Sequence, residues 1–397
     1  MPLGTALAIA AVFVVTRVYP PNVRQFESVR SFFGVHKIVT NADGAYRVLM
    51  HGTTIHGAQR LLNADGTPVQ GRPEMITYYQ ADGGIGGAIE AIRARKGGNL
   101  RAAVIGLGSM GAGMAGSLLK AGFSVAACDV NREAVARFEA AGGRGAATPA
   151  EAAEGADVVV CVVVNAAQTE AVLFGPAGAA ETMRPGAVFV SSATMDPAIA
   201  RRLAARLEET GRLYLDAPMS GGAARAAEGA LTFLASGSEA AFAAARPALD
   251  AMAGKLYELG DVAGQGAAFK MINQLLAGVH IAAASEAMCF AAKQGLDLAK
   301  VYDVITASAG NSWMFENRMP HVLDGDYSPK SAVDIFVKDL GIVQDMARAE
   351  RYPVPVAAAA LQMFLAASGA GMGRDDDASV ARVYAQLSGT TLPAAKA

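Results

Sequence analysis

From residue 101 onward, short apolar runs alternate with longer segments whose apolar residues recur every three or four positions. Continuous apolar runs are typical of strands buried on both faces, and the longer segments have the period of helices. The expected strands are 102–105, 123–128, 157–164, 187–190 and 213–216, and the expected helices are 112–121, 133–141, 149–155, 169–174 and 197–210. This alternation predicts an α/β, Rossmann-type fold with a doubly wound parallel sheet over residues 101–261.

After residue 266 the pattern shows no further strand. The segment 269–294 is apolar on almost every face, which predicts one long buried helix, and helical periodicity returns at 298–308, 333–350 and 355–368. An all-α domain should therefore follow the sheet. Because such a helix needs burial between two domains or two subunits, we expect a homo-oligomer, either a dimer or a tetramer.

The first hundred residues differ from the rest. Residues 1–16 form an uncharged, mostly apolar stump. This stump is shorter than the ~20 residues that span a bilayer, and it lacks the basic start of a signal peptide. Residues 17–100 look β-rich, with strands expected at 31–39 and 46–50 and a short helix at 84–95. The predicted domains are the stump 1–16, the β-rich segment 17–100, a dinucleotide-binding domain 101–264 and a helical domain 265–397.

Charge and cysteine content restrict the class of protein. The net charge is +4 over residues 1–100 and −6 over the remainder, so the chain lacks the basic balance of a nucleic-acid binder. With 52% hydrophobic residues it can bury a large core. Its three cysteines lie singly in apolar runs, as reduced core residues of a cytoplasmic protein do, and its histidines have no metal-ligand spacing. We expect no metal, nucleic acid or membrane partner.

A glycine-rich turn follows the first predicted strand of the sheet. Gly106, Gly108 and Gly111 are spaced G-x-G-x-x-G, and Asp129 ends the second strand. The first glycine allows a tight turn, the second lets backbone approach a pyrophosphate, and the third lets helix pack on strand. Asp129 can accept both hydroxyls of an adenosine ribose and repels a 2′-phosphate, which favours NAD over NADP. The adjacent pair 131–132, Asn-Arg, would serve NADP in the alternative.

Two further features carry chemistry. Lys270 lies in the long apolar helix with Asn273 one turn later on the same face. Desolvation lowers the pKa of a buried lysine and makes it a general base for an alcohol proton, whereas a lysine that reaches the surface only packs. The loop Ser220-Gly221-Gly222 offers a hydroxyl and bare backbone N–H groups to a carboxylate, although an ordinary tight turn has the same composition.

Together these residues resemble the β-hydroxyacid dehydrogenase family. The matching stretches are IGLGSMGAGMA (105–115), SATMDP (192–197), DAPMSGG (216–222), GAAFKMINQ (266–274) and KDLG (338–341). The resemblance extends over residues 101–392, and it implies an oxidoreductase that transfers a hydride from a small hydroxy acid to NAD.

The resemblance also implies a role for each matching residue. Lys270 would be the catalytic base or acid, and the substrate would be bound by Ser220, Gly221, Gly222 and Asn273. The implied cofactor-binding residues are Gly106, Leu107, Gly108, Met110, Gly111, Asp129, Asn131, Thr194 and Lys338. The sequence departs from the family pattern at Gln274, where a second asparagine is frequent, and at Asn165, where many members have proline.

Within the family, VVVNAAQTEAVLFG (162–175) and SAGNSWMFENR (308–318) are most similar to the members that oxidise L-threonate at C2 to 2-oxo-tetronate. That similarity makes Asn311, Ser312, Trp313 and Asn317 candidates for the polar end of the acid, although core packing explains the aromatic residues equally well. The alternatives are reduction of tartronate semialdehyde and oxidation of 3-hydroxyisobutyrate.

Residues 17–100 resemble a different protein class. RSFFGVHKI, HGTTIHGAQ and ITYYQADGGIGGAI are similar to the N-terminal part of the catalytic domain of spermidine synthase-like proteins. No aminopropyl-transfer half follows, so we expect no such activity, and His51 and His56 are expected to be packing or turn residues. Two other hypotheses remain for this segment, namely transfer chemistry with an adenosyl cofactor and a scaffold that binds a partner.

Overall fold

The computed structural model describes residues 100–395, Thr67 and the backbone of four N-terminal strands. The chain divides into two compact units, Met1–Gly98 and Asn99–Ala397. In the first unit an antiparallel sheet has the order β1-β2-β3-β4. Its strands are β1 (Arg24–Ser31), β2 (Gly34–Thr40), β3 (Tyr46–His51) and β4 (Thr54–Arg60). The stump 1–16 and the helix expected at 84–95 lie outside the described residues.

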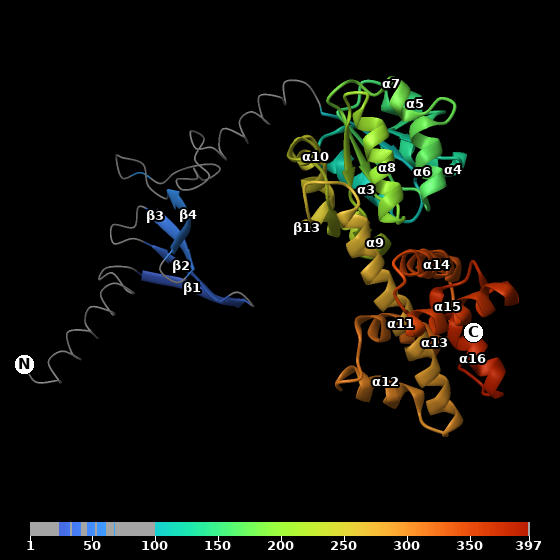
Figure 1. The fold of residues 1–397 in the computed structure, drawn as a ribbon. Coiled ribbons are helices and arrows are strands. Elements are labelled where there is room, and N and C mark those ends of the chain that lie inside the picture. Colours follow the sequence, from blue (N-terminus) through green and yellow to red (C-terminus); the bar gives the residue numbers. More distant parts are fainter. Residues whose placement is uncertain are drawn as a thin grey trace, which may run out of the picture. The chain divides into compact units, whose positions relative to one another are not determined.

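The second unit begins with a six-stranded parallel sheet (Figure 1). Its strands are β5 (Arg101–Ile105), β6 (Ser124–Cys128), β7 (Arg144–Gly145), β8 (Val158–Cys161), β9 (Val188–Ser191) and β10 (Leu213–Asp216). They pair in the order β10-β9-β8-β5-β6-β7, which confirms the predicted doubly wound sheet. The direction of winding reverses between β5 and β8, the place where such sheets bind ligands at the carboxyl ends of their strands.

Helices cover both faces of this sheet. One face is covered by α3 (Gly111–Lys120), α4 (Arg132–Ala140) and α10 (Glu239–Met252), and the other by α5 (Pro149–Ala153), α6 (Ala166–Phe174), α7 (Ala179–Thr182) and α8 (Pro197–Glu208). Successive strand residues alternate between the two cores: Val104 and Val160 join the first, and Ile105 and Cys161 join the second. The cysteines are all buried and unpaired, as the sequence predicts.

A second, three-stranded sheet was not predicted. It consists of β11 (Met219–Ser220), β12 (Leu231–Ala235) and β13 (Ala253–Glu258), with the short helix α9 (Gly222–Glu228) between the first two. β11 is antiparallel to β12, and β13 is parallel to β12. These short strands lie in an alanine-rich stretch with few β-branched residues, so their pairing depends on tertiary contacts rather than on local propensity.

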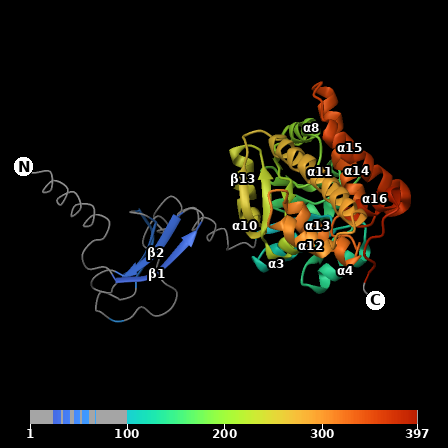
Figure 2. The same ribbon diagram turned by 90° about the horizontal axis from the view of Figure 1, so that it is seen from below.

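The remainder of the second unit is helical, as expected. It contains α11 (Gln265–Lys293), α12 (Leu298–Thr306), α13 (Trp313–Asp324), α14 (Val333–Ala349), α15 (Pro355–Ala367), the turns η1 (Ser368–Met372) and η2 (Asp377–Ser379), and α16 (Val380–Ser388). Helices α13 to α16 pack against α11, which leads out of the sheet domain (Figures 1 and 2). The sequence analysis had missed α13 and α16.

The expectation that α11 is buried on every face is wrong for a single chain. One face carries Lys270 and Gln274 and is buried, whereas Phe269, Ile272 and Leu276 are about half exposed or more. Helix α11 and the segment Pro355–Met372 are long and apolar enough to span a membrane. Core helices of soluble proteins also meet this criterion of length and composition. One face of α11 is therefore apolar and exposed in the single chain.

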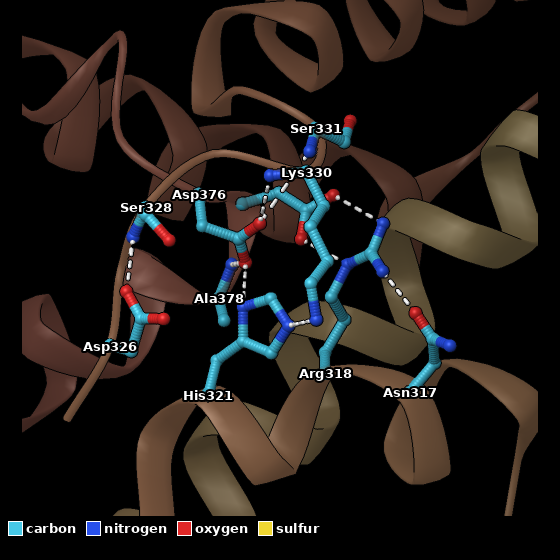
Figure 3. Close-up of polar contacts among 10 residues, drawn as sticks. Asn317, Arg318, His321, Asp326, Ser328, Lys330, Ser331, Asp376 and Ala378 are labelled. Atoms are coloured by element: carbon cyan, nitrogen blue, oxygen red, sulfur yellow. Dashed lines mark hydrogen bonds and ion pairs between the residues drawn. The ribbon is translucent and has the colours of Figure 1, made fainter. Parts of the chain in front are cut away.

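A buried cluster of charged side chains joins α13 to η2 (Figure 3). Arg318 Nε donates to Asp377 Oδ1 at 2.5 Å, and His321 Nδ1 lies 3.0 Å from Asp376 Oδ1. On the other edge of the imidazole, Lys330 Nζ lies 2.8 Å from Nε2. Both carboxylates are fully buried, so each depends on its partner in this cluster to offset desolvation.

Candidate active site

The glycine turn has the geometry of a phosphate cradle. Gly106 has a φ of +97°, and a Cβ on it would lie 2.3 Å from the carbonyl oxygen of Val162. A Cβ on Gly111 would lie 1.9 Å from the carbonyl oxygen of Gly106, whereas one on Gly108 would meet nothing within 4 Å. The first and third glycines are thus required by close packing, and the second faces open space, as a pyrophosphate contact needs.

The N-terminus of α3 is available to an anion. Its N-cap residue, Met110, makes no side-chain cap to the helix. A ten-residue helix presents unpaired N–H groups and the positive end of its dipole there. The residues present therefore fit the diphosphate of a dinucleotide.

Asp129 is fixed at the carboxyl end of β6. Its Oδ2 accepts a hydrogen bond from the backbone N–H of Leu107 at 2.5 Å, and its Oδ1 accepts one from the backbone N–H of Asn131 at 2.7 Å. The N–H of Leu107 is thereby used within the protein. The side chain of Asn131 caps α4 by accepting from Glu133 and Ala134. Asp129 therefore ties the glycine turn to the start of α4.

Lys270 lies in the second turn of α11 and is only 8% exposed, so its side chain does not reach the surface. Burial lowers its pKa to about 8, the carboxylate of Asp339 acts in the opposite direction, and the ammonium of Lys338 adds to the lowering. A lysine in this state exchanges a proton near neutral pH, which is the property that a general base or acid needs.

A chain of polar contacts runs beside Lys270 from α11 to α14 and into the sheet domain. Gln274 Nε2 donates to Asp339 Oδ2 at 2.6 Å, and Lys338 Nζ lies 2.6 Å from Asp339 Oδ1. Lys338 Nζ also donates to the carbonyl oxygen of Thr194 at 3.2 Å. The side chain of Asn273 donates to Gln274 Oε1 at 3.0 Å. The structure thus brings Thr194, Lys338, Gln274 and Asn273 into one network.

Sequence reasoning missed the centre of this network. Asp339 is 1% exposed, and it lies in the KDLG stretch that was quoted only for its lysine. Asp339 lies three residues after Phe336 and four before Val343, on the apolar stripe of α14, and a carboxylate at such a position was the available signal. Gln274, which departs from the family pattern, is the residue that holds Asp339 from α11.

The Ser-Gly-Gly loop connects β11 to α9. Ser220 ends β11, Gly221 has a φ of +143° and Gly222, with a φ of +79°, begins α9. These left-handed conformations favour glycine, and a Cβ on Gly221 would also press on Arg225 and Leu231 at 3.1 Å. The loop lies four residues after Asp216, whose carboxylate contacts the first turn of α11.

The candidates at the start of α13 have local partners. Ser312 caps this helix by accepting from Phe315 N–H, and Asn311 Nδ2 donates to Glu316 Oε1 and to the carbonyl oxygen of Thr306. Arg318 donates to the side-chain oxygen of Asn317. Met314 and Phe315 are buried in the core, whereas Trp313 is 60% exposed. Asn165 caps α6 by accepting from Gln168 N–H.

Metal chemistry has no evident site here. Between residues 100 and 395 no group of three or more His, Cys, Asp and Glu side chains is placed to hold a metal ion. The described residues do offer a helix N-terminus beside the glycine turn, a carboxylate at the end of β6 and a buried lysine with a pKa of about 8.

Comparisons with known proteins agree with this geometry. Residues 101–260 match the NAD binding domain of 6-phosphogluconate dehydrogenase, and residues 264–384 match the NAD-binding domain of NADP-dependent 3-hydroxyisobutyrate dehydrogenase. The chain is 58% identical to an L-threonate dehydrogenase of Cupriavidus necator, over 71% of this chain and 95% of the relative. It is 50% identical to the L-threonate dehydrogenase of Escherichia coli K12, over 76% and 99% respectively.

Solved structures give the same result. A crystal structure of a 3-hydroxyisobutyrate dehydrogenase from Salmonella typhimurium is 52% identical, with a TM-score of 0.69, and covers 72% of this chain and 100% of its own. The Mycobacterium tuberculosis 3-hydroxyisobutyrate dehydrogenase is 31% identical, with a TM-score of 0.65 over 72% and 99%. With its NAD(P)-binding sheet domain, its buried lysine and these relatives, the chain belongs to the β-hydroxyacid dehydrogenase family, oxidoreductases that act on CH–OH donors.

Proposed function

We propose that this protein oxidises L-threonate at C2 to 2-oxo-tetronate, with NAD as the acceptor and Lys270 as the general base. The observation that carries the proposal is the burial of Lys270 on α11, with a pKa lowered to about 8. The choice of substrate is supported by the L-threonate dehydrogenases that are 49–58% identical over nearly their full length.

The proton is handled by Lys270. When bound, NAD accepts the hydride that leaves the hydroxyl-bearing carbon. Neutral Lys270 Nζ accepts the hydroxyl proton, and because its pKa is about 8, about half of the lysine is neutral at pH 8. The resulting ammonium lies near the Asp339 carboxylate, whose influence on Lys270 favours the charged form. In the reverse direction the same group donates the proton.

The remaining residues bind and orient the substrate and cofactor. The backbone N–H groups of Gly221 and Gly222 and the Ser220 hydroxyl would hold the carboxylate of the acid, and the amide of Asn273 would contact its hydroxyls. By the family resemblance, Thr194 and Lys338 would lie near the nicotinamide end, and the hydrogen bond between them joins the sheet domain to α14. The glycine turn, including Leu107 and Met110, would hold the diphosphate.

NAD is preferred over NADP in this proposal because of Asp129. Its carboxylate is held at the end of β6 by two backbone N–H groups, where it can accept from ribose hydroxyls and repels a 2′-phosphate. The side chain of Asn131 is engaged in capping α4, which leaves Arg132 as the nearby residue that could accommodate a phosphate.

The decisive experiment follows NADH formation by absorbance with L-threonate, D-threonate, 3-hydroxyisobutyrate and glycerate, each with NAD and with NADP. We expect turnover with L-threonate and NAD that falls ~10²–10⁴-fold in Lys270→Ala, because a general base is lost. NAD binding by this variant should survive, as measured by fluorescence titration of NADH. Undiminished turnover of Lys270→Ala would refute the role of the lysine.

The assay also tests the oxidation of 3-hydroxyisobutyrate as a second candidate reaction. The 52% identical Salmonella protein carries the name 3-hydroxyisobutyrate dehydrogenase. Turnover confined to 3-hydroxyisobutyrate would retain the roles of Lys270 and the Ser-Gly-Gly loop and would reject the L-threonate assignment. Tartronate semialdehyde with NADH tests the remaining alternative in the reducing direction.

We also propose that the enzyme is a cytoplasmic homo-oligomer in which a second copy covers the exposed face of α11. Phe269, Ile272 and Leu276 lie on that face at helical spacing, which is typical of a surface packed against a partner. Light scattering of the wild type and of Ile272→Glu tests this assignment. A wild type that is monomeric at micromolar concentration would refute it.

The dehydrogenase is proposed to begin at about residue 101, because the first family match starts there and the second follows from residue 264. Residues 17–100 are then a separate spermidine synthase-like segment behind an apolar stump. A variant lacking residues 1–98 should retain dehydrogenase turnover. Loss of turnover or of assembly in this variant would favour a scaffold role for the segment.

A further inference from the structure

Helix α11, which carries Lys270, does not cap its own N-terminus. Its N-cap residue is Gly264, which has no side chain and a φ of +97°. Instead, Asp216 at the end of β10 supplies the cap: its Oδ2 accepts from the backbone N–H of Gly264 at 2.9 Å and of Ala267 at 2.8 Å. Ser236 Oγ accepts from Gly266 N–H at 2.9 Å, so a second neighbouring segment caps the same turn.

The helix start is pressed directly against the strands. A Cβ on Gly266 would lie 2.3 Å from the carbonyl oxygen of Leu234 and 3.0 Å from that of Asp216, so no side chain fits between them. The first turn of α11 therefore has little freedom to shift while these hydrogen bonds are intact.

The capping carboxylate is completely buried. Asp216 is 0% exposed, and burial raises its pKa to about 6, with the two N–H donors, the Ser236 hydroxyl and the more distant Arg201 acting in the opposite direction. It is therefore mainly charged at neutral pH, next to the positive end of a 29-residue helix. All these bonds use Oδ2, and Oδ1 has no hydrogen-bond partner among the described residues. A buried carboxylate with one unpartnered oxygen is costly, and the hydrogen bonds to Oδ2 offset that cost.

Asp216 lies between the two halves of the proposed site. Its hydrogen bond to Ala267 reaches the first turn of α11, and Lys270 follows three residues further on, in the second turn. In the other direction, Ser220 of the carboxylate-binding loop follows Asp216 by four residues. One side chain thus links the segment that would hold the substrate to the helix that would deprotonate it.

We propose that Asp216 is a positioning residue, which fixes the first turn of α11 against β10 and thereby sets Lys270 relative to the substrate. This inference rests on the proposed role of Lys270 as the general base. Asp216 touches neither substrate nor cofactor in this scheme. Its effect is on the geometry of proton transfer, where a displacement of about 1 Å can cost about 100-fold in rate.

The test compares Asp216→Ala, which removes the cap, with Asp216→Asn, whose amide oxygen can keep both backbone bonds at the Oδ2 position. We expect kcat to fall about 100-fold in Asp216→Ala and less than about 5-fold in Asp216→Asn. The rates are measured well below the melting temperature and are expressed per active site, counted by titration with NADH. The KM for NAD should change less than about 3-fold in both, because the glycine turn is unaffected. The substrate is the acid of the panel with the highest turnover.

Asp297→Ala is the matched control. Asp297 caps α12 by accepting from the backbone N–H groups of Ala299 and Lys300, so its loss removes a helix cap of the same kind on a different helix. We expect kcat of this variant to stay within about 2-fold of wild type, although its melting temperature should fall by an amount typical of a lost cap.

A double-mutant cycle separates positioning from general structural damage. If Asp216 acts through Lys270, then Asp216→Ala should lower the residual rate of Lys270→Ala by less than about 2-fold, because the group to be positioned is already absent. An equal loss in both backgrounds, or a loss no larger than in Asp297→Ala, overturns the inference. Wild-type turnover of Lys270→Ala would instead refute the proposed function, and the inference with it.

Ser236→Ala keeps the test decisive if Asp216→Ala does not fold. This change removes one hydroxyl that caps Gly266 and donates to Asp216 Oδ2 at 3.4 Å. We expect kcat to fall about 5-fold, with the loss again absent from the Lys270→Ala background. Unchanged kcat of Ser236→Ala would then count against a positioning role for this cap.

Discussion

Replacing Lys270 by methionine should stabilise the protein at neutral pH while abolishing its turnover. Methionine has a similar length and no charge to desolvate. The ordinary lysine pKa of 10.5 falls to about 8 in the folded protein, a difference of about 2.5. Because each pKa unit corresponds to about 1.4 kcal/mol, the buried ammonium costs up to about 3.4 kcal/mol of folding free energy.

The pH dependence follows from the direction of this change. Below pH 8 the lysine is charged in both states, so folding bears the full cost. Between pH 8 and 10.5 the folded state is mainly neutral while the unfolded state is still mainly protonated, so folding releases a proton and the cost declines as pH rises. Above pH 10.5 both states are neutral and the cost disappears. The advantage of Lys270→Met should therefore be constant up to pH 8 and vanish by about pH 10.5.

The assay is thermal and urea unfolding of wild type and Lys270→Met from pH 6 to 10.5. We expect the variant to melt up to about 7 °C higher at pH 7, taking roughly 2 °C per kcal/mol for a unit of this size. The loss of the lysine leaves Asp339 with its two partners, Gln274 and Lys338, so no carboxylate is orphaned. The exposed Lys300→Met is the control and should change stability by less than about 0.5 kcal/mol. A Lys270→Met variant no more stable than wild type at pH 7 would show that Lys270 is not desolvated.

Three further changes test other parts of the structure. Gly108→Ala should fold normally, because the added Cβ meets nothing within 4 Å. The KM for NAD should nevertheless rise at least about 10-fold, because the methyl group fills the space beside the diphosphate. An NAD affinity equal to that of the wild type would show that Gly108 does not contact the cofactor. Gly111→Ala should instead lose stability by more than about 2 kcal/mol, since its Cβ would lie 1.9 Å from a backbone oxygen, and a melting temperature near wild type would contradict the packing. Burial acts to raise the pKa of Asp376, but hydrogen bonds from His321 and from backbone N–H groups outweigh burial, and the pKa is lowered. The Asp376 carboxylate therefore stabilises the folded protein above the ordinary carboxyl pKa, and this stabilisation is lost as the pH falls through the lowered pKa. Asp376→Ala should accordingly lower the free energy of unfolding by about 3 kcal/mol at pH 7. The control is Asp345→Ala, which breaks the exposed ion pair with Arg348, and a smaller loss of stability in Asp376→Ala than in this control would contradict a stabilising role of the buried cluster.

The sequence alone determined the features whose signals are local. A glycine turn between a strand and a helix needs only the spacing of Gly106, Gly108 and Gly111, because backbone clashes set that spacing whatever surrounds it. Likewise, a lysine in an apolar helical pattern is buried when the helix packs, which is how Lys270 could be identified. The parallel sheet and the helical domain followed from hydrophobic periodicity in the same way.

Tertiary structure decided the features that join distant segments. Asp216 and the first turn of α11 are 51 residues apart, and Gln274 and Asp339 are 65 residues apart, so no local pattern marks either pair. The sheet formed by β11, β12 and β13 depends on pairing among short strands within an alanine-rich stretch. The exposed face of α11 is apolar in sequence whether or not its own chain covers it. Periodicity shows that a helix has an apolar face, whereas only the packed chain shows which face is covered and which polar groups hold it in place.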